Sequence, residues 1–437
     1  MKKERMKKTI IIISALLLCG SAFAQEETPS KFKLYGFIRN YAVLDTREVK
    51  AGTEDLYFYM PQDKNISSLT GEDLNEGLNW RFVSLTTRLG LDVSGYKFGK
   101  MGVSGKVEAD FYNMNGSVAI LRLRQAFMKL KWDESLLSLT IGQTWHPMAA
   151  DMPHMNNLET GAPFNMFNRS PQVTADVAAG DFTFTASLLY LNHYLPTGPD
   201  GKTKNYFKYG LPEAYVGVSY KHGGVLARVG MDVLNIKPVA YVGYNKKDGV
   251  LDETKLVRGY TMDKKVAKAS GLLTTMSPFA FFQYTSGKFQ LRAKSVLAQA
   301  GEHLNLLSGY GFASLDDVNH VYTYTPMQDW SSFVSFSYGK KVQAMCMLGY
   351  MKQLGTTQDL AEGGALWMNT AADTKIQQAF RATPTVAWNI GKFTVSLEYN
   401  MTAAEFGRGE RDLRGLYTGD KEWILNHRFI CMTKFNF

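Results

Sequence analysis

The chain ends in the stretch Asn426 to Phe437, which reads NHRFICMTKFNF. Side chains of a β-strand point alternately to opposite faces, so residues two apart share a face. One face of this stretch would carry Phe429, Cys431, Thr433, Phe435 and Phe437. The other face would carry Arg428, Ile430, Met432, Lys434 and Asn436. The pattern predicts a terminal β-strand with one mostly apolar face, one partly charged face and an aromatic last residue.

The N-terminus has the three parts of a secretory signal peptide. A basic region precedes the mainly apolar segment Ile10 to Cys19, and Ala22-Phe23-Ala24 supplies the small residues that signal peptidase needs. We predict that residues 1–24 are removed and that residues 25–437 form a single exported domain. Met6 would serve as a start as well as the first methionine, with no effect on the mature chain.

The mature chain lacks the sequence of a helical membrane protein. Removing the signal peptide leaves 413 residues and takes away five basic and one acidic side chain, so the net charge falls from +9 to +5. No later run approaches the roughly 20 apolar residues that a spanning helix needs. Strands cross a bilayer only as a closed barrel, because every backbone N–H and C=O must be paired in lipid. If the mature chain spans a membrane, it must do so as a β-barrel.

The same alternation recurs in segments far from the C-terminus. Between residues 103 and 111, the apolar residues Val103, Val107, Ala109 and Phe111 alternate with Ser104, Lys106, Glu108 and Asp110. Residues 393–400 alternate in the same way. The charged face cannot meet lipid and must meet water or protein. A soluble sandwich also alternates, but it would keep its apolar face inside.

Short and long connections alternate between these strands, as in membrane β-barrels. Short turns, several with a glycine that allows positive φ, are predicted at 95–100, 132–135, 179–181, 221–224, 286–288, 338–341 and 390–392. Longer outer loops are predicted at 47–78, 113–117, 145–170, 194–211, 243–268, 304–320, 355–373 and 406–420. The pattern predicts an all-β, transmembrane antiparallel barrel of 16 strands. Segment 225–244 is taken as one strand past Pro238, and two strands there would make 18.

Basic side chains recur on the face predicted to point inward. They are Arg39, Arg88, Lys106, Arg122, Arg124, Arg292, Lys294, Arg381 and Arg428. Arginine keeps its charge and presents a planar fork of donors, which suits carboxylates or phosphates passing through water. Glu108, Asp110, Asp92 and Glu398 share that face and would offset part of the charge. Two interpretations stay open: the arginines select anions, or the charges only solvate the lumen and pair with each other.

Strands four to six carry motifs of a known family. Leu123-Arg124-Gln125-Ala126-Phe127 is followed by Ile141-Gly142-Gln143-Thr144-Trp145 and then by Asn168-Arg169-Ser170-Pro171-Gln172. A weaker likeness lies at Tyr35-Gly36-Phe37-Ile38-Arg39, and the last strand resembles the C-terminal signal of bacterial outer-membrane barrels. The chain therefore resembles the DcaP-like trimeric porins of Gram-negative bacteria.

That resemblance implies a homotrimer of 16-stranded barrels in the outer membrane, passing small and often anionic solutes such as dicarboxylates. It also implies contact with outer-membrane lipid and with the barrel-assembly machinery, through the strand that ends in Phe437. Several members carry a helical coiled-coil extension before the barrel. Here only Gln25 to Ser30 precede the first strand, so trimerisation would rest on the barrel wall.

The third outer loop, 145–170, is expected to fold inward and narrow the pore. It reads WHPMAADMPHMNNLETGAPFNMFNRS and is too rich in Pro, Met and Asn for a strand. Its apolar residues, among them Met148 and Phe164, would be costly in a fully solvated loop. The predicted constriction residues are Trp145, His146, Asp151, His154 and Glu159, with Arg169 facing the opening.

We expect a porin for passive diffusion of small hydrophilic anions, without enzymatic activity, metal or cofactor. His146 and His154 lie eight residues apart and lack the spacing of a metal site. The alternatives are a barrel-type lipase or protease, and an adhesin or antigen that displays its loops. No local Ser-His-acid motif is present, although such sites are recognised by geometry rather than spacing. The basic residues alternate along strands instead of clustering, which argues against nucleic acid.

Overall fold

The structure is a computed structural model. It describes residues 31–53, 55–113, 119–158, 160–369 and 373–437. Residues 1–30, 54, 114–118, 159 and 370–372 lie outside the described residues; they include the predicted signal peptide, Glu159 and parts of three other predicted outer loops. Among the residues described, no helix combines the length and the apolar character needed to cross a bilayer.

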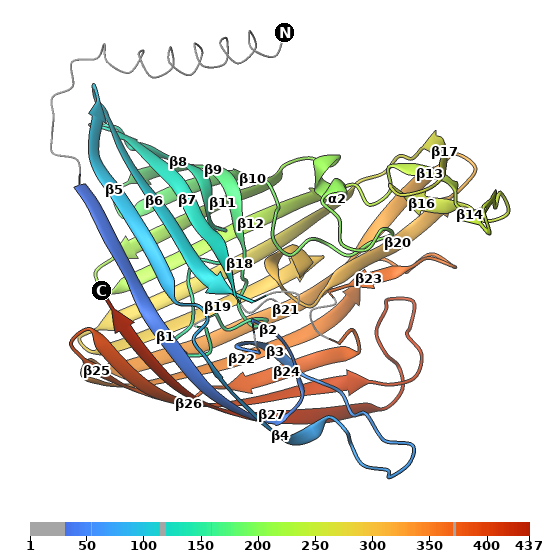
Figure 1. Cartoon of the computed structure of the whole chain (residues 1–437). Helices are drawn as coiled ribbons and strands as arrows, with labels where there is room; N and C mark the ends of the chain where they lie inside the picture. Colours follow the sequence, from blue (N-terminus) through green and yellow to red (C-terminus); the bar gives the residue numbers. More distant parts are fainter. Residues whose placement is uncertain (1–30, 54, 114–118, 159, 370–372) are drawn as a thin grey trace, which may run out of the picture.

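In the described part of the chain, sixteen antiparallel wall strands form one closed barrel (Figure 1). The wall strands are β1 (Lys31–Arg47), β4 (Glu76–Val83) continued by β5 (Arg88–Phe98), β6 (Met101–Tyr112), β7 (Ile120–Trp132), β8 (Leu137–Trp145), β9 (Arg169–Ala179), β10 (Phe182–Leu189), β11 (Glu213–His222), β12 (Val225–Ile236), β18 (Leu273–Ser286), β19 (Phe289–Gln299), β21 (Val321–Gly339), β22 (Val342–Thr356), β24 (Ile376–Ala382) continued by β25 (Thr385–Ile390), β26 (Phe393–Gly407) and β27 (Lys421–Asn436). The predicted fold class and strand number are confirmed.

The first and last strands close the barrel. β1 pairs with β27 from Phe37↔Asn436 to Asp45↔Arg428, and its other edge pairs with β4 and β5. The short turns gather at one end of the barrel, beside the C-terminus, and the long loops gather at the other (Figure 1). Each wall strand thus has a hydrogen-bonded neighbour on both sides, as a membrane-spanning sheet requires.

The faces of the last strand are those that the sequence predicts. Phe429 and Phe435 are 49% and 45% exposed on the outer surface, whereas Ile430 and Met432 are each 2% exposed. The outward residues form part of an apolar belt that continues over neighbouring strands. The inward Ile430 and Met432 are not open to water, because the loops described below cover them.

One predicted strand is shorter than expected. Segment 225–244 is not continuous: β12 stops at Ile236, before Pro238, because proline has no N–H to donate to a ladder. Residues beyond it form β13 (Tyr241–Tyr244), which pairs with β16 (Val257–Gly259) and β17 (Lys264–Lys268) in an outer loop. This small sheet lies outside the wall, so the strand number stays at 16.

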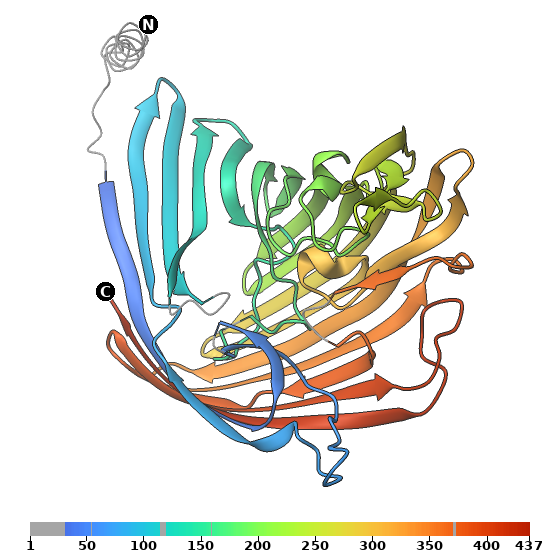
Figure 2. The ribbon, with the colours of Figure 1, turned by 45° about the vertical axis from the view of Figure 1, so that its right-hand side comes forward.

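Among the described residues, the first, third and sixth outer loops fold into the barrel. The first loop (48–75) contains a hairpin of β2 (Val49–Gly52) and β3 (Tyr57–Pro61), which crosses the interior (Figure 2). The third loop (146–168) lies against the inner wall, and the sixth loop (300–308) contributes the short helix η2 (Gly301–Leu304). The remaining outer elements include α2 (Asn205–Lys208), β14 (Lys246–Lys247), β15 (Val250–Leu251), β20 (Gly309–Asp316) and β23 (Leu366–Met368).

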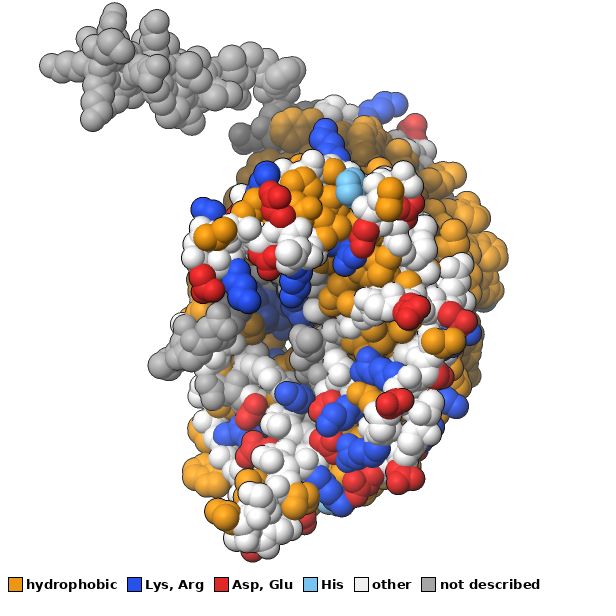
Figure 3. All heavy atoms as spheres, turned by 90° about the vertical axis from the view of Figure 1, so that its right-hand side faces the viewer, with side chains coloured by type: hydrophobic (Ala, Val, Ile, Leu, Met, Phe, Trp, Pro, Cys, Tyr) orange, Lys and Arg blue, Asp and Glu red, His pale blue; other side chains and the backbone are white. Residues whose placement is uncertain are grey.

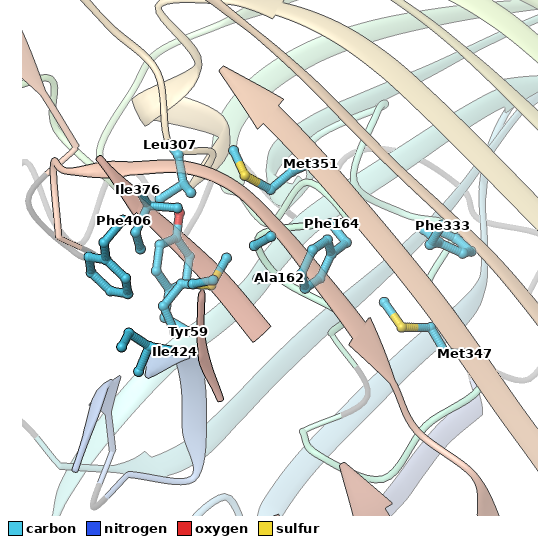
Figure 4. Close-up of a cluster of buried hydrophobic side chains, with 13 residues drawn as sticks. Tyr59, Ala162, Phe164, Leu307, Phe333, Met347, Met351, Ile376, Phe406 and Ile424 are labelled. Atoms are coloured by element: carbon cyan, nitrogen blue, oxygen red, sulfur yellow. The ribbon is translucent and has the colours of Figure 1, made fainter. Parts of the chain in front are cut away.

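Apolar contacts hold these loops in place. Figure 4 shows Ala162 and Phe164 of the third loop beside Tyr59 of the first loop and Met347 and Met351 of β22. All five are at most 1% exposed. Burying such side chains contributes about 1.5–3 kcal/mol each for the large ones, which favours the inward position of both loops. The inward fold predicted for the third loop is therefore confirmed.

Candidate functional site: an arginine-lined cavity

A cavity of about 730 Å³ lies inside the barrel, between the infolded loops and the wall from β1 to β9. Five arginines line it: Arg39 of β1, Arg88 of β5, Arg122 and Arg124 of β7, and Arg169 of β9. Aromatic side chains complete the lining: Tyr57, Tyr59, Tyr112, Trp145, Phe167 and Tyr194. Viewed from the end that carries the long loops, Lys and Arg side chains surround the central hollow (Figure 3).

Strand register brings two of the arginines onto carboxylates of the neighbouring strand. Asp110 of β6 lies opposite Arg122 of β7, and a bulge follows between Glu108 and Ala109. Arg122 donates to both oxygens of Asp110 at 3.0 Å, through Nε and Nη2. Arg124 donates to Glu108 Oε1 at 2.8 Å and to Asp110 Oδ2 at 2.6 Å. These contacts fix both guanidinium planes at the cavity surface.

Arg39 and Arg88 contact a threonine, an acid and an aromatic ring among the described residues. Arg39 donates from Nε and Nη2 to Thr86 Oγ1, at 3.2 and 3.0 Å. Both guanidinium groups lie over the ring of Phe37, at 4.8 Å for Arg39 and 4.9 Å for Arg88. Arg88 Nη1 is also 3.6 Å from Glu108 Oε1. These contacts hold both guanidinium groups at the cavity surface.

Arg169 is the exceptional member of the set. Its side chain is fully buried, yet Nε, Nη1 and Nη2 donate no hydrogen bond to any group in the described part of the chain. Its guanidinium carbon lies 5.0 Å from the ring centre of Trp145 and 5.3 Å from that of Phe167. The guanidinium carbon of Arg124 also lies 5.8 Å from the ring centre of Trp145. A buried cation thus faces the cavity with its donors unused.

The described lining of the cavity is rich in cations. It holds five arginines and the carboxylate of Asp110, and Glu108 lies beside it, paired with Arg124. His193, in the loop after β10, adds no positive charge at neutral pH: burial, and then the charges of Arg169, Arg122 and Arg124, lower its pKa to about 4. An anion entering this space would therefore be attracted, and a cation repelled.

Three predicted pore-lining residues and the inward Lys294 contact infolded loops or a buried carboxylate and are absent from the lining of this cavity; whether they line the pore stays a prediction. Arg292 Nη1 donates to Met152 O at 2.7 Å, and Lys294 Nζ donates to Met148 O at 2.8 Å. Both carbonyls belong to the third loop. The inward direction is as expected, but the infolded loop takes up the donors.

Arg381 and Arg428 are the deepest of these four. Arg381 donates to the carbonyls of Ala162 and Tyr59, at 2.8 Å each, and so joins the third loop to the first. Arg428 forms a two-bond pair with Asp45, with Nε to Oδ1 at 2.8 Å and Nη2 to Oδ2 at 2.7 Å. Both arginines are 0% exposed. They anchor loops and strands.

Lys106 lies apart from both groups. Its Nζ is 2.7 Å from Asp92 Oδ1 and donates to the Tyr35 hydroxyl at 2.9 Å. Arg88, Arg122 and Arg124 remain in the cavity lining, as predicted residues of the pore. Whether any of them selects solutes stays a prediction at this point.

The predicted constriction residues are dispersed along the third loop. Trp145 lines the cavity, whereas His146 is fully buried against the wall. Asp151 Oδ2 is 3.2 Å from Arg228 Nε. His154 lies near Arg292, and burial followed by that charge lowers its pKa to about 4. Glu159 lies outside the described residues.

Sequence reasoning missed the contribution of the first loop. Tyr57 and Tyr59 line the cavity although segment 47–78 was expected to be an ordinary outer loop. The apolar run from Leu56 to Met60 was the available signal, because such a run is unusual in a solvated loop. His193 and Tyr194 also line the cavity, and no pattern in the sequence marks them.

No protein-family model matches the chain, and no curated protein matches it. Solved structures do match. The DcaP outer-membrane channel of Acinetobacter baumannii aligns with a TM-score of 0.63 over 94% of this chain and 99% of its own, at 16% identity. OmpT of Vibrio cholerae gives 0.52 over 94% and 99%, at 14% identity. An anion-selective porin from Comamonas acidovorans gives 0.51 over 94% and 100%, at 9% identity. The chain has the fold of the outer-membrane porins.

Proposed function

We propose that the protein is a porin of a Gram-negative outer membrane, through which small hydrophilic anions diffuse passively. The observation that carries the proposal is Arg169, a fully buried guanidinium with no hydrogen-bond partner in the described residues, at the surface of a cavity lined by four further arginines. The same function is supported by the outer-membrane porin fold, the closed barrel and the arginine-lined interior. The fold shared with an anion-selective porin agrees with it.

The energetics of Arg169 favour an anionic solute. Burying an ionised group costs several kcal/mol even after relaxation of the protein. Each of the two cation–π contacts offsets about 0.5–2 kcal/mol of this cost. The remaining cost is relieved when a carboxylate accepts the free donors, since charge-assisted hydrogen bonds from arginine are short and strong. The protein therefore gains most from solutes that carry such a group.

The spread of the arginines favours dicarboxylates over single ions. Arg169 and Arg122 come from two different strands around one cavity, so they can contact two separated anionic groups at once. Planar guanidinium forks match planar carboxylates in two-bond pairs. We infer that small dicarboxylates lower the chloride current by competing for the cavity.

The decisive experiment compares R169Q with the parent protein in planar bilayers under a salt gradient. The parent should show a reversal potential with the sign of an anion-selective channel. In R169Q this reversal potential should fall by about half or more. R258Q is the matched control. It also removes one positive charge, but Arg258 pairs with Asp317 in an outer loop. Equal reversal potentials for parent and R169Q would contradict the role of Arg169; absence of conductance in the parent would contradict the porin itself.

We also propose that the chain assembles as a homotrimer through the wall near β1 and β4. Leu78 and Trp80 of β4 are each 76% exposed, and Leu69 in the protruding first loop is 94% exposed. Lipid would satisfy the strand residues, but Leu69 lies in a polar loop beyond them. L69D should weaken the trimer, measured by light scattering in detergent. A parent protein that is monomeric at all concentrations would refute the trimer.

A further inference from the structure

Four side chains that bind metals in other proteins meet inside the barrel, away from the arginine-lined cavity. They are His146 of the third loop, His303 of η2, Glu213 of β11 and Asp232 of β12. All four are at most 2% exposed. They come from chain positions up to 157 residues apart, so no local spacing could have indicated them. The cluster joins two infolded loops to two wall strands.

The distances between donor atoms match a small coordination sphere. His146 Nε2 is 2.8 Å from Glu213 Oε1 and 3.5 Å from Asp232 Oδ1. His303 Nε2 is 3.1 Å from Asp232 Oδ2 and 3.7 Å from Glu213 Oε1. Tetrahedral ligands held about 2.0–2.1 Å from a zinc ion lie roughly 3.3 Å from one another. The observed separations fall on either side of that value.

Unused acceptors are the second, independent observation. Glu213 Oε2 and Asp232 Oδ1 are buried and accept no hydrogen bond in the described part of the chain. A buried carboxylate oxygen without a donor is costly, so native proteins seldom leave one. With neutral imidazoles the cluster carries two negative charges. One divalent cation would neutralise it.

The imidazoles are not equally prepared for coordination. His303 Nδ1 is 3.2 Å from Ala300 O and donates its proton there, which leaves the Nε2 lone pair for a metal, as is usual for ligating histidines. His146 Nδ1 instead accepts from the Met148 N–H at 3.2 Å. Ligation by His146 requires a proton on Nδ1, so this contact would be given up on binding.

We propose that His146, His303, Glu213 and Asp232 form a structural site for one divalent transition-metal ion, with zinc as the best match. Two nitrogens and two carboxylate oxygens in a buried cluster suit zinc. Calcium prefers six to eight oxygen ligands, which this cluster does not offer. The ion holds the start of the third loop, at His146, against the sixth loop. Asn168, at the end of the third loop, already donates to His303 O at 2.6 Å.

The test uses the full-length barrel refolded in detergent after chelator treatment. Titration with Co²⁺ should give the intense visible bands of a tetrahedral complex at about one ion per chain, and Zn²⁺ should displace it. Zinc present during refolding should also raise the thermal midpoint. If the spectrum remains that of aqueous Co²⁺, the proposal is overturned. The cluster is then a set of ion pairs between protonated histidines and carboxylates.

Variants then locate the ion. H303Q and D232N should each weaken zinc binding by about 100-fold or more, since ligand loss exceeds the 10–100-fold cost of losing a supporting contact. H222Q is the control, because His222 is exposed at a short turn. Heat-modified mobility on gels shows which variants fold. Binding that survives H303Q and D232N, or that H222Q abolishes, would place the metal elsewhere and refute the site.

Discussion

The two sides of the barrel interior use the same residue type for opposite purposes. On the cavity side, from β1 to β9, Arg39, Arg88, Arg122, Arg124 and Arg169 line about 730 Å³ of open space. On the anchor side, from β19 to β27, Arg292, Lys294, Arg381 and Arg428 donate to loop carbonyls or to a buried carboxylate. Inward charge alone therefore does not define a pore residue. What decides its role is whether a loop lies on it.

The comparison also explains why the anchor side tolerates buried cations. Arg381 donates three hydrogen bonds, to Thr402 Oγ1, Ala162 O and Tyr59 O, each at 2.8 Å. Hydrogen bonds to charged groups contribute about 1.5–3 kcal/mol each, enough to offset the cost of burial. Arg169 has no such bonds to any residue that the structure describes. The two arginines are equally buried, yet only one has an unmet need for an anion.

The largest expected effect breaks the anchor side. R428M removes the partner of buried Asp45 and should lower the free energy of unfolding by about 3 kcal/mol, at the low end for buried pairs because Arg81 still contacts Asp45 at 2.8 Å. Urea unfolding in lipid vesicles, followed by tryptophan fluorescence, measures it. K97M, which breaks the exposed pair with Asp133, should cost at most about 1 kcal/mol. Equal losses for both variants would contradict the anchor role.

The second prediction has the opposite sign. R169L removes a buried cation without a partner and should raise the free energy of unfolding by about 1–3 kcal/mol at low ionic strength. The same urea titration applies. A loss of stability would mean that Arg169 has a structural role, like Arg381, and would remove the distinction between the two sides.

A smaller effect tests whether paired arginines on the cavity side still matter. R122Q should lower the anion-to-cation permeability ratio about twofold, the scale of a solvent-screened charge worth about 0.5 kcal/mol. R122Q/D110N should restore it, because the double variant has the parent net charge. Reversal potentials measure both. A double variant as poor as R122Q would show that the Arg122 guanidinium itself, and not the net charge, is required.

The smallest effect concerns His193. Burial, and then Arg169, Arg122 and Arg124, lower its pKa to about 4 from an ordinary 6.5, so anion preference should stay constant from pH 8 to 5. The unfolded chain binds this proton below pH 6.5 and the folded chain does not, so His193 should reduce stability as pH falls from 6.5 toward 4. H193Q should remove that loss. A change in reversal potential near pH 6.5 would contradict the assigned pKa.

Much of the wall could be predicted because strand alternation is local. The outward Phe429 and the inward Arg428 follow from period two alone, and the glycine turns mark where each strand ends. The prediction went too far only at Pro238, where it extended a strand past a residue that cannot donate to its neighbour. The third loop was also predictable, since its apolar residues needed cover.

The alternating barrel strands, the inward direction of the arginines and the infolded third loop could be read from the amino-acid sequence, because each follows from neighbouring residues and their period. Only the tertiary structure decided which arginines stay open. Arg381 meets Tyr59 and Ala162 across gaps of 322 and 219 residues, and such contacts depend on where whole loops settle. The same long-range packing assembled His146 with His303 and left Arg169 without a hydrogen-bond partner in the described part of the chain.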